Sequence, residues 1–214
     1  MNYPSESIEN FISQDEVGLL LQTYRDSEKR EKSTGPTVGY LQNEITDAIV
    51  DRIKERYGDF EVFRVQFFDV TYPHVIHNDA EPEDDLVERA FLLPLWHNGD
   101  SDPLFFTFDQ WFGLHPAKFF KDGPEPKNVV TNTPVYDYKD VEYLTDKEFD
   151  KQVWHEHFTH IHRHWLDGLS IEKEFKWRPG NMIVFHRHRL HCASDFRKNG
   201  VTNKIGLSIF TRKV

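Results

Sequence analysis

The stretch Gly180-Asn181-Met182-Ile183-Val184-Phe185, which runs on toward His191, carries most of the information about the architecture of this chain. Pro179 and Gly180 form a pair that is typical of a tight turn at the start of a strand. The apolar run from Met182 to Phe185 has the length and composition of a buried strand. We therefore expect a turn, then a strand, and a histidine beyond the end of that strand.

A second motif, His77-Asn78-Asp79, lies far upstream and follows a strand-like run, Val62 to Phe68, in which apolar and polar residues partly alternate. Because side chains repeat every two residues in an extended strand, His77 and Asp79 would point the same way and could bind one metal ion. A second histidine would complete a set of two histidines and one carboxylate. That set leaves coordination positions open and is typical of non-haem Fe(II) sites.

The last part of the chain contains a strong hairpin signal, Asn199-Gly200, which predicts that Val201 to Arg212 folds back alongside the preceding strand. Strand alternation would then put Lys204, Gly206 and Ser208 on one face and Ile205, Leu207 and Ile209 on the other. A cation on an inward face with a serine beside it suits an anionic cosubstrate. The alternative is a lysine that is solvated at the surface of the hairpin.

Together these residues resemble the 2-oxoglutarate and Fe(II)-dependent dioxygenase superfamily, over roughly Val62 to Val214. The first motif of that family is His-x-Asp, which His77 and Asp79 match. Its distal histidine follows a Pro-Gly turn, an apolar strand and a phenylalanine, and His191 fits that spacing. A basic residue on the next strand binds the far carboxylate of 2-oxoglutarate, and Lys204 stands at that position.

The sequence departs from the family pattern at several positions. Lys204 replaces the commoner arginine, and a lysine is a point charge without the two-pronged fork of arginine. The frequent Arg-x-Ser becomes Lys204-Ile205-Gly206, with Ser208 one strand repeat further on. Asn181 stands where aspartate is common. His186 and His188 compete with His191, because they are two residues apart and could bind a metal together on a strand.

The resemblance implies a mainly β fold with flanking helices, namely a double-stranded β-helix or jelly roll. We expect residues 1–214 to form a single domain. Within it, residues 1–60 would be helical support, and residues 61–214 would be the jelly-roll core with an insertion at 113–170.

Local patterns are consistent with this order of elements. Helices are expected from Ser7 to Lys32 and from Asn43 to Tyr57, because both segments carry apolar residues at helical spacing. Ser13 stands three residues before Glu16, which predicts a capping box. Apolar, aromatic runs predict buried strands at Phe91 to Trp96 and Leu104 to Phe108.

The resemblance further implies an oxidoreductase in which His77, Asp79 and His191 hold Fe(II). Its cosubstrates would be 2-oxoglutarate and O2, and it would release succinate and CO2 while hydroxylating a C–H bond. Lys204 would bind the distal carboxylate of 2-oxoglutarate. A jelly roll that binds a metal without turnover, or with cupin-like chemistry, is the alternative.

Three further polar residues are candidate cofactor contacts. Ser208 shares the predicted face of Lys204. Arg64 and Gln66 share one face of the strand before His77, where they would contact cosubstrate or substrate, or would simply be exposed to solvent.

A histidine-rich segment invites a different interpretation, a zinc site. We expect a helix from Lys147 to Leu169, in which His160 and His164 are one turn apart and could share a metal. However, Thr159 occupies the place of the second histidine of a metalloprotease motif. We therefore interpret the cluster as a solvated helix face. Its histidines are His155, His157, His160, His162 and His164.

The composition is that of an ordinary enzyme. The 214 residues are 38% hydrophobic and 14% aromatic, which is enough to fill one core. The single cysteine, Cys192, and the lack of a secretion signal or membrane span predict a cytoplasmic protein. The formal net charge of −10 disfavours nucleic acid as a partner, so we expect a small-molecule or peptide substrate.

Overall fold

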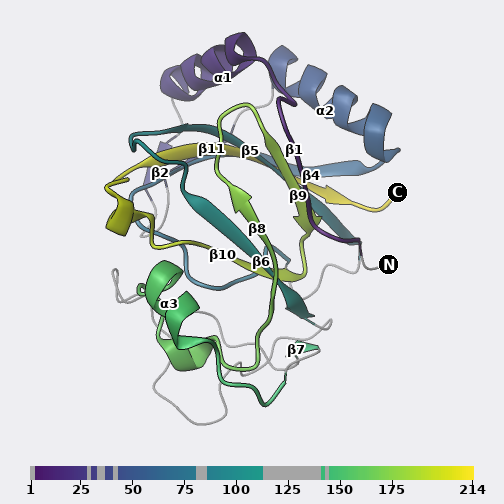
Figure 1. The fold of residues 1–214 in the computed structure, drawn as a ribbon. Helices are drawn as coiled ribbons and strands as arrows, with labels where there is room; N and C mark the ends of the chain where they lie inside the picture. The colour runs from purple at the N-terminus through teal and green to yellow at the C-terminus, as the bar shows by residue number, and fades with distance from the viewer. Residues whose placement is uncertain are drawn as a thin grey trace.

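The computed structural model describes residues 3–27, 30–32, 37–40, 43–80, 86–112, 141–142 and 145–214. Two antiparallel sheets face each other, and two helices cover the outer side of the larger sheet (Figure 1). The expected mainly β fold with flanking helices is therefore confirmed. Residues 113–140 and 143–144 of the expected insertion lie outside the described part of the chain.

The larger sheet contains seven strands. In spatial order they are β1 (Glu6–Ile8), β9 (Met182–His186), β5 (Val87–His97), β11 (Lys204–Arg212), β4 (Glu61–Val70), β3 (Thr37–Tyr40) and β2 (Arg30–Lys32). In the smaller sheet, β6 (Leu104–Phe112) pairs with β10 (Arg189–Ala193), β7 (Val141–Glu142) and β8 (Ile171–Lys176). The strands that the sequence predicted around residues 62–68, 91–96, 104–108 and 182–185 are all present.

Helices α1 (Gln14–Asp26) and α2 (Glu44–Tyr57) pack on the outer face of the large sheet. The predicted capping box is confirmed, because the Glu16 N–H donates to Ser13 Oγ and the Ser13 N–H donates to Glu16 Oε2.

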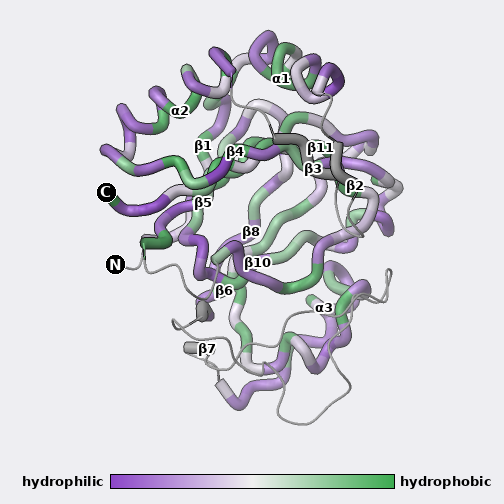
Figure 2. Tube along the Cα trace, turned by 180° about the vertical axis from the view of Figure 1, so that it is seen from behind, coloured by the Kyte–Doolittle hydropathy of each residue, from purple (hydrophilic) through white to green (hydrophobic). Residues whose placement is uncertain are grey.

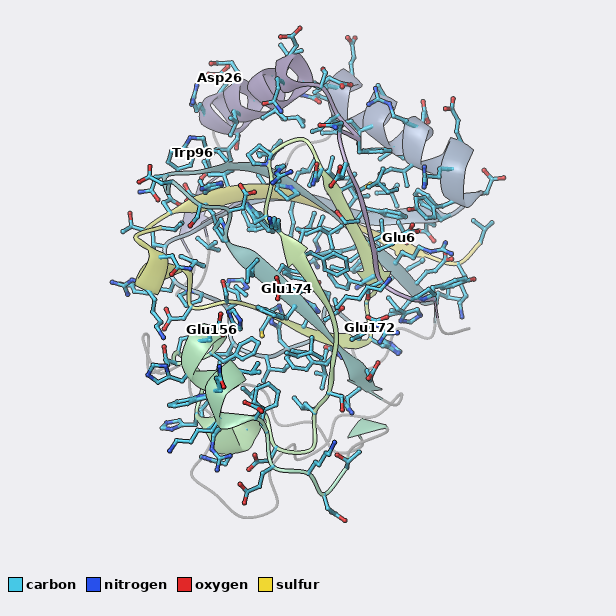
Figure 3. All side chains as sticks on the ribbon, in the orientation of Figure 1. Glu6, Asp26, Trp96, Glu156, Glu172 and Glu174 are labelled. Carbon is cyan, nitrogen blue, oxygen red and sulfur yellow. The ribbon has the colours of Figure 1, made fainter. Side chains whose placement is uncertain are left out.

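Both helices alternate between hydrophilic and hydrophobic residues along their length (Figure 2). Two exposed acidic side chains are labelled in Figure 3: Asp26 lies on α1 near the top of the view, and Glu156 lies on α3 (Lys151–His157), about half-way down.

The first predicted helix, from Ser7 to Lys32, is too long at both ends. Glu6–Ile8 is instead the edge strand β1, paired with β9, and Arg30–Lys32 is strand β2. The apolar spacing near the start of the segment could not reveal this, because the pairing partner of β1 lies far away in the sequence. The cap at Ser13 was the more reliable signal of where the helix begins.

Strand β11 lies in the middle of the large sheet, between β4 and β5. The predicted hairpin at Asn199-Gly200 is therefore wrong, since β11 does not fold back along β9. Gly200 has a φ of 77° and caps the 3-10 helix η2 (Phe196–Asn199). A glycine with a positive φ can end a helix as well as form a hairpin turn. Here the strand that precedes Gly200 is β10, which belongs to the small sheet, so Gly200 does not join two neighbouring strands of one sheet.

The predicted division of β11 into two faces is confirmed. Ile205, Leu207 and Ile209 pack in the core between the sheet and the helices. Lys204 and Ser208 face the space between the two sheets. Because of this alternation, β11 presents polar side chains to the interior on only one of its two faces.

The predicted helix from Lys147 to Leu169 is also wrong, because the segment contains only α3 and the 3-10 helix η1 (Arg163–Trp165). Phe158, His160 and Ile161 are all buried. On a helix, residues 158 and 160 would be roughly 200° apart around the axis and could not share a core. The helix ends at Phe158, and the turn that follows brings these side chains inward.

No helix in the described part of the chain is long and apolar enough to cross a membrane.

Gly206 lies on the inner face of β11, where a Cβ atom would be 2.6 Å from Phe68 Cζ and 2.7 Å from Trp177 Cζ2. We expect Gly206→Ala to lower the free energy of unfolding by about 1–3 kcal/mol, because two packed rings must move. Denaturant titration measures this. The control is Gly18→Ala in α1. The added Cβ would have no heavy atom within 4 Å, so this change should raise the free energy of unfolding by about 0.5–1 kcal/mol. Equal stability of Gly206→Ala and wild type would contradict the packing.

Candidate metal centre

His77 and His191 are joined through their main chains. The His77 N–H donates to the His191 carbonyl over 3.0 Å, and the His191 N–H donates to the His77 carbonyl over 2.9 Å. This isolated bridge puts the two imidazole rings side by side, with their centroids 4.2 Å apart. His77 and Asp79 lie in irregular backbone, so strand alternation does not align these two residues, and the bridge instead aligns His77 with His191.

The structure brings Asp79 to the same place. Its Oδ2 lies 3.4 Å from His191 Nε2, and its Oδ1 lies 3.9 Å from His77 Nε2. One ligand atom from each of the three residues lies within 4.8 Å of the others. His191 is buried, whereas His77 and Asp79 are half-buried, so the group is reached from one side.

Hydrogen bonds define which nitrogen of each histidine carries the proton. His77 Nδ1 donates to the Val75 carbonyl over 2.7 Å, and His191 Nδ1 donates to the Arg189 carbonyl over 3.0 Å. A carbonyl only accepts, so each Nδ1 is protonated, and each Nε2 is the ring nitrogen that faces Asp79. Metal-binding histidines are oriented in this way.

Burial disfavours the charged form of each of these groups, and this acts in opposite directions on the pKa of His191 and of Asp79. Desolvation, and then the neighbouring His77, lowers the pKa of His191 well below its ordinary value, so its imidazole is neutral. Desolvation raises the pKa of Asp79 because a buried carboxylate without a cation is costly. Two imidazoles and one carboxyl group, converging from one side, fit a divalent first-row metal with open coordination positions.

The competing histidines are arranged differently. The His188 N–H donates to His186 Nδ1, and neither residue is among the potential metal ligands that converge in the described chain. His155, His162 and His164 are exposed, as expected for a solvated face, but His160 is buried. His160 Nε2 donates to the His74 carbonyl over 3.2 Å. The broken helix separates His160 from His164, so the geometry expected for a shared zinc ion is absent.

A cavity of about 90 Å³ begins at the three converging residues and extends between the two sheets. Such a volume holds several water molecules or one small organic molecule. Its wall is mostly apolar and includes Phe68, Leu92, Phe105, Trp177, Phe185 and Phe210. Gln66, Ser208, Lys204 and His74 add polar groups. A mainly apolar cavity with few polar groups is typical of a small-molecule site.

Lys204 is the charged group of this cavity and is only 4% exposed. Its Nζ lies 4.0 Å from the centroid of the Trp177 ring and 5.3 Å from that of Phe196. Desolvation lowers the pKa of Lys204 to about 7. Among the described residues no carboxylate or hydrogen-bond acceptor is paired with Nζ, so the cavity lacks an anion for this ammonium group. The alternative of a solvated hairpin lysine is wrong.

The other candidate residues divide into two groups. Gln66 and Ser208 are opposite each other on β4 and β11 and both line the cavity. Arg64 is one strand repeat further along β4 and does not line it; its guanidinium lies 5.1 Å from the centroid of the Phe63 ring. The sequence analysis missed His74, whose ring lies 5.4 Å from that of His77. His74 lies in a loop, and a loop has no periodic sequence pattern from which the position of this side chain could be predicted.

The fold matches several solved structures. A Pseudomonas putida prolyl-4-hydroxylase superposes with a TM-score of 0.50 and 14% identity over 99% of this chain and 94% of that one. The non-haem α-ketoglutarate-dependent epimerase SnoN from nogalamycin biosynthesis has a TM-score of 0.54 and 12% identity over 98% and 78%. A Burkholderia pseudomallei oxidoreductase of the 2OG-Fe(II) oxygenase family has a TM-score of 0.53 and 10% identity over 98% and 84%.

No family model and no curated protein sequence matches the chain. At 10–14% identity the structural likeness establishes the fold alone. That fold is the jelly roll of the 2-oxoglutarate/Fe(II) oxygenase structures, and it is the fold that the sequence motifs predicted.

We expect His77→Ala and His191→Ala to abolish Mn(II) binding, because each removes one of three converging ligand atoms. His188→Ala is the control and should bind Mn(II) as wild type does. The loss of the free Mn(II) signal in electron paramagnetic resonance measures binding. Retained binding in His77→Ala, together with loss on changing His160 or His164, would instead assign the metal to the histidine-rich segment.

Proposed function

We propose that this protein is a non-haem Fe(II) and 2-oxoglutarate-dependent dioxygenase that hydroxylates a small-molecule or peptide substrate and releases succinate and CO2. One observation carries the proposal. The cavity has three side chains that could hold a metal ion at one end, and inside it lies the buried amino group of Lys204, which has no anionic partner among the described residues. The match of the fold to 2-oxoglutarate/Fe(II) oxygenase structures supports it.

In this proposal His77, Asp79 and His191 would hold Fe(II), next to the space where 2-oxoglutarate would bind. The bound iron supplies the activation of O2 for oxidative decarboxylation and C–H oxidation. Lys204 binds the distal carboxylate. The Ser208 hydroxyl would donate a hydrogen bond to the same carboxylate.

Charge balance supports this assignment. Asp79 and Lys204 are opposite charges in one poorly solvated cavity, and they do not pair with each other. The formal charges of Fe(II), Asp79, Lys204 and a dicarboxylate cancel, so binding of both ligands offsets the desolvation of both side chains. The aromatic wall excludes water and strengthens each of these interactions.

Gln66 lines the cavity on the strand next to Ser208, and we propose it as a second hydrogen-bonding contact for 2-oxoglutarate. Arg64 does not line the cavity, and its contact with cosubstrate or substrate stays a prediction. A cytoplasmic location, inferred from the single cysteine, stays a prediction.

Anaerobic titration of the Fe(II)-loaded protein with 2-oxoglutarate tests the proposal. We expect the visible charge-transfer band of an iron-chelated keto acid, and succinate on admission of air. Lys204→Ala should need at least about tenfold more 2-oxoglutarate, because loss of a buried charge pair typically costs several kcal/mol. Lys204→Arg should retain most of the affinity. Metal binding without any band would favour a non-catalytic or cupin-like metal-binding jelly roll.

We also expect a defined pH dependence. Since the pKa of Lys204 is lowered to about 7, this side chain loses its charge in the free protein as the pH rises above that value. A bound carboxylate favours the ammonium form, so binding takes up a proton above that pH. Affinity for 2-oxoglutarate should then fall by up to roughly tenfold per pH unit and level off at lower pH.

Calorimetric titration of the Mn(II)-loaded protein on both sides of this pH measures the dependence. Lys204→Arg is the matched control, because its guanidinium stays charged and the profile should be flat. An equally steep profile in Lys204→Arg would assign the proton uptake to another group.

A further inference from the structure

The turn between β9 and β10 contains an arginine, Arg187, that is only 1% exposed. Arginines are rarely buried to this extent, since the guanidinium loses its hydration. A hairpin turn at a surface would not require such burial. The contacts of the guanidinium explain it.

Arg187 holds both polar groups of the Asp79 main chain. Its Nε and Nη2 donate to the Asp79 carbonyl over 3.0 and 2.8 Å, as a two-pronged fork on one oxygen. The Asp79 N–H donates to the Arg187 carbonyl over 3.0 Å. In the described part of the chain, these are all the main-chain hydrogen bonds of Asp79. Arg187 Nη1 also donates to the Thr211 carbonyl over 3.3 Å, which ties the fork to β11.

Two aromatic rings fix the plane of this guanidinium. Its central carbon lies 4.9 Å from the centroid of Phe63 and 5.2 Å from that of Phe210. Phe63 is the extra residue of a bulge, because Phe210 pairs with Arg64 and Thr211 pairs with Val62. Stacking restricts the rotation of the fork, and a lysine could not reproduce this geometry.

Asp79 needs such support more than the two histidines do. His77 and His191 hold each other through their reciprocal bridge. Asp79 lies in irregular backbone, two residues beyond that bridge. Without a fixed main chain, its carboxylate could leave the 3.4 and 3.9 Å contacts that aim it at the two Nε2 atoms.

We infer that Arg187 is a positioning residue for the metal centre: by holding the main chain of Asp79, it sets the place of the carboxylate ligand, and metal affinity depends on it. Arg187 itself donates to main-chain oxygens and not to the carboxylate. The inference rests on the metal site of the proposed function. It does not require that 2-oxoglutarate is the cosubstrate.

Two variants separate positioning from simple electrostatics. The charge of the guanidinium acts in two directions, because it repels a bound cation and also stabilises the ionised carboxylate of Asp79, so the variant that keeps the charge is the decisive one. Loss of a positioning contact weakens binding. Arg187→Lys keeps the charge and removes the fork, whereas Arg187→Met removes both and keeps most of the apolar stem.

We would titrate apo protein with Mn(II), using electron paramagnetic resonance, in wild type and three variants. Arg187→Lys and Arg187→Met should both bind Mn(II) roughly tenfold or more weakly. The control is Arg212→Met, which removes a guanidinium 3.9 Å from the centroid of the same Phe63 ring, and should bind as wild type does or slightly more tightly. Thermal unfolding of each metal-free protein shows how much of each sample is folded.

Each outcome has a defined meaning. Wild-type affinity in Arg187→Lys, or tighter binding in Arg187→Met, would overturn the inference. If Arg187→Met does not fold, Arg187→Lys decides. If wild type binds no Mn(II), both the inference and the proposed function fail. If wild type binds Mn(II) but gives no charge-transfer band with Fe(II) and 2-oxoglutarate, only the proposed function fails.

Discussion

Two reciprocal main-chain hydrogen bonds join His77 to His191 and hold the loop after β4 against strand β10. The bridge connects segments more than a hundred residues apart, one leading out of the large sheet and one inside the small sheet. Because it aligns the two imidazoles, the carboxylate of Asp79 needs only one further support to complete the triad. That support is the buried guanidinium of Arg187.

The interior of the jelly roll contains two poorly solvated ionisable groups that do not pair with each other in the described part of the chain. Asp79 and Lys204 line the same cavity, and their desolvation acts on both pKa values. A folded protein tolerates such groups when ligands offset the cost of burying them. The cavity is therefore better understood as a binding site than as a packing defect. The aromatic rings around Lys204 define its shape and limit its access to water.

Several features could be predicted from the sequence because they depend on residues that are neighbours along the chain. The capping box of Ser13 and Glu16 was predicted correctly, and so were the two faces of β11. The hairpin at Asn199-Gly200 and the helix through the histidine-rich segment were predicted wrongly. In both cases the local pattern was compatible with two structures, and contacts with distant segments determined which one formed. Strand β11 pairs with β4 and β5, and the segment after α3 turns so that Phe158 and His160 are buried.

From the sequence alone, the family resemblance of its motifs implied the jelly roll and the candidate triad of His77, Asp79 and His191, and strand alternation predicted the inward lysine, because motifs and alternation are properties of the chain alone. Only the tertiary structure decided that His77 pairs with His191, that Lys204 has no anionic partner among the described residues, and that Arg187 holds the main chain of Asp79. These are contacts between segments that are distant in sequence. Their formation depends on how the two sheets pack, and no local propensity encodes that packing.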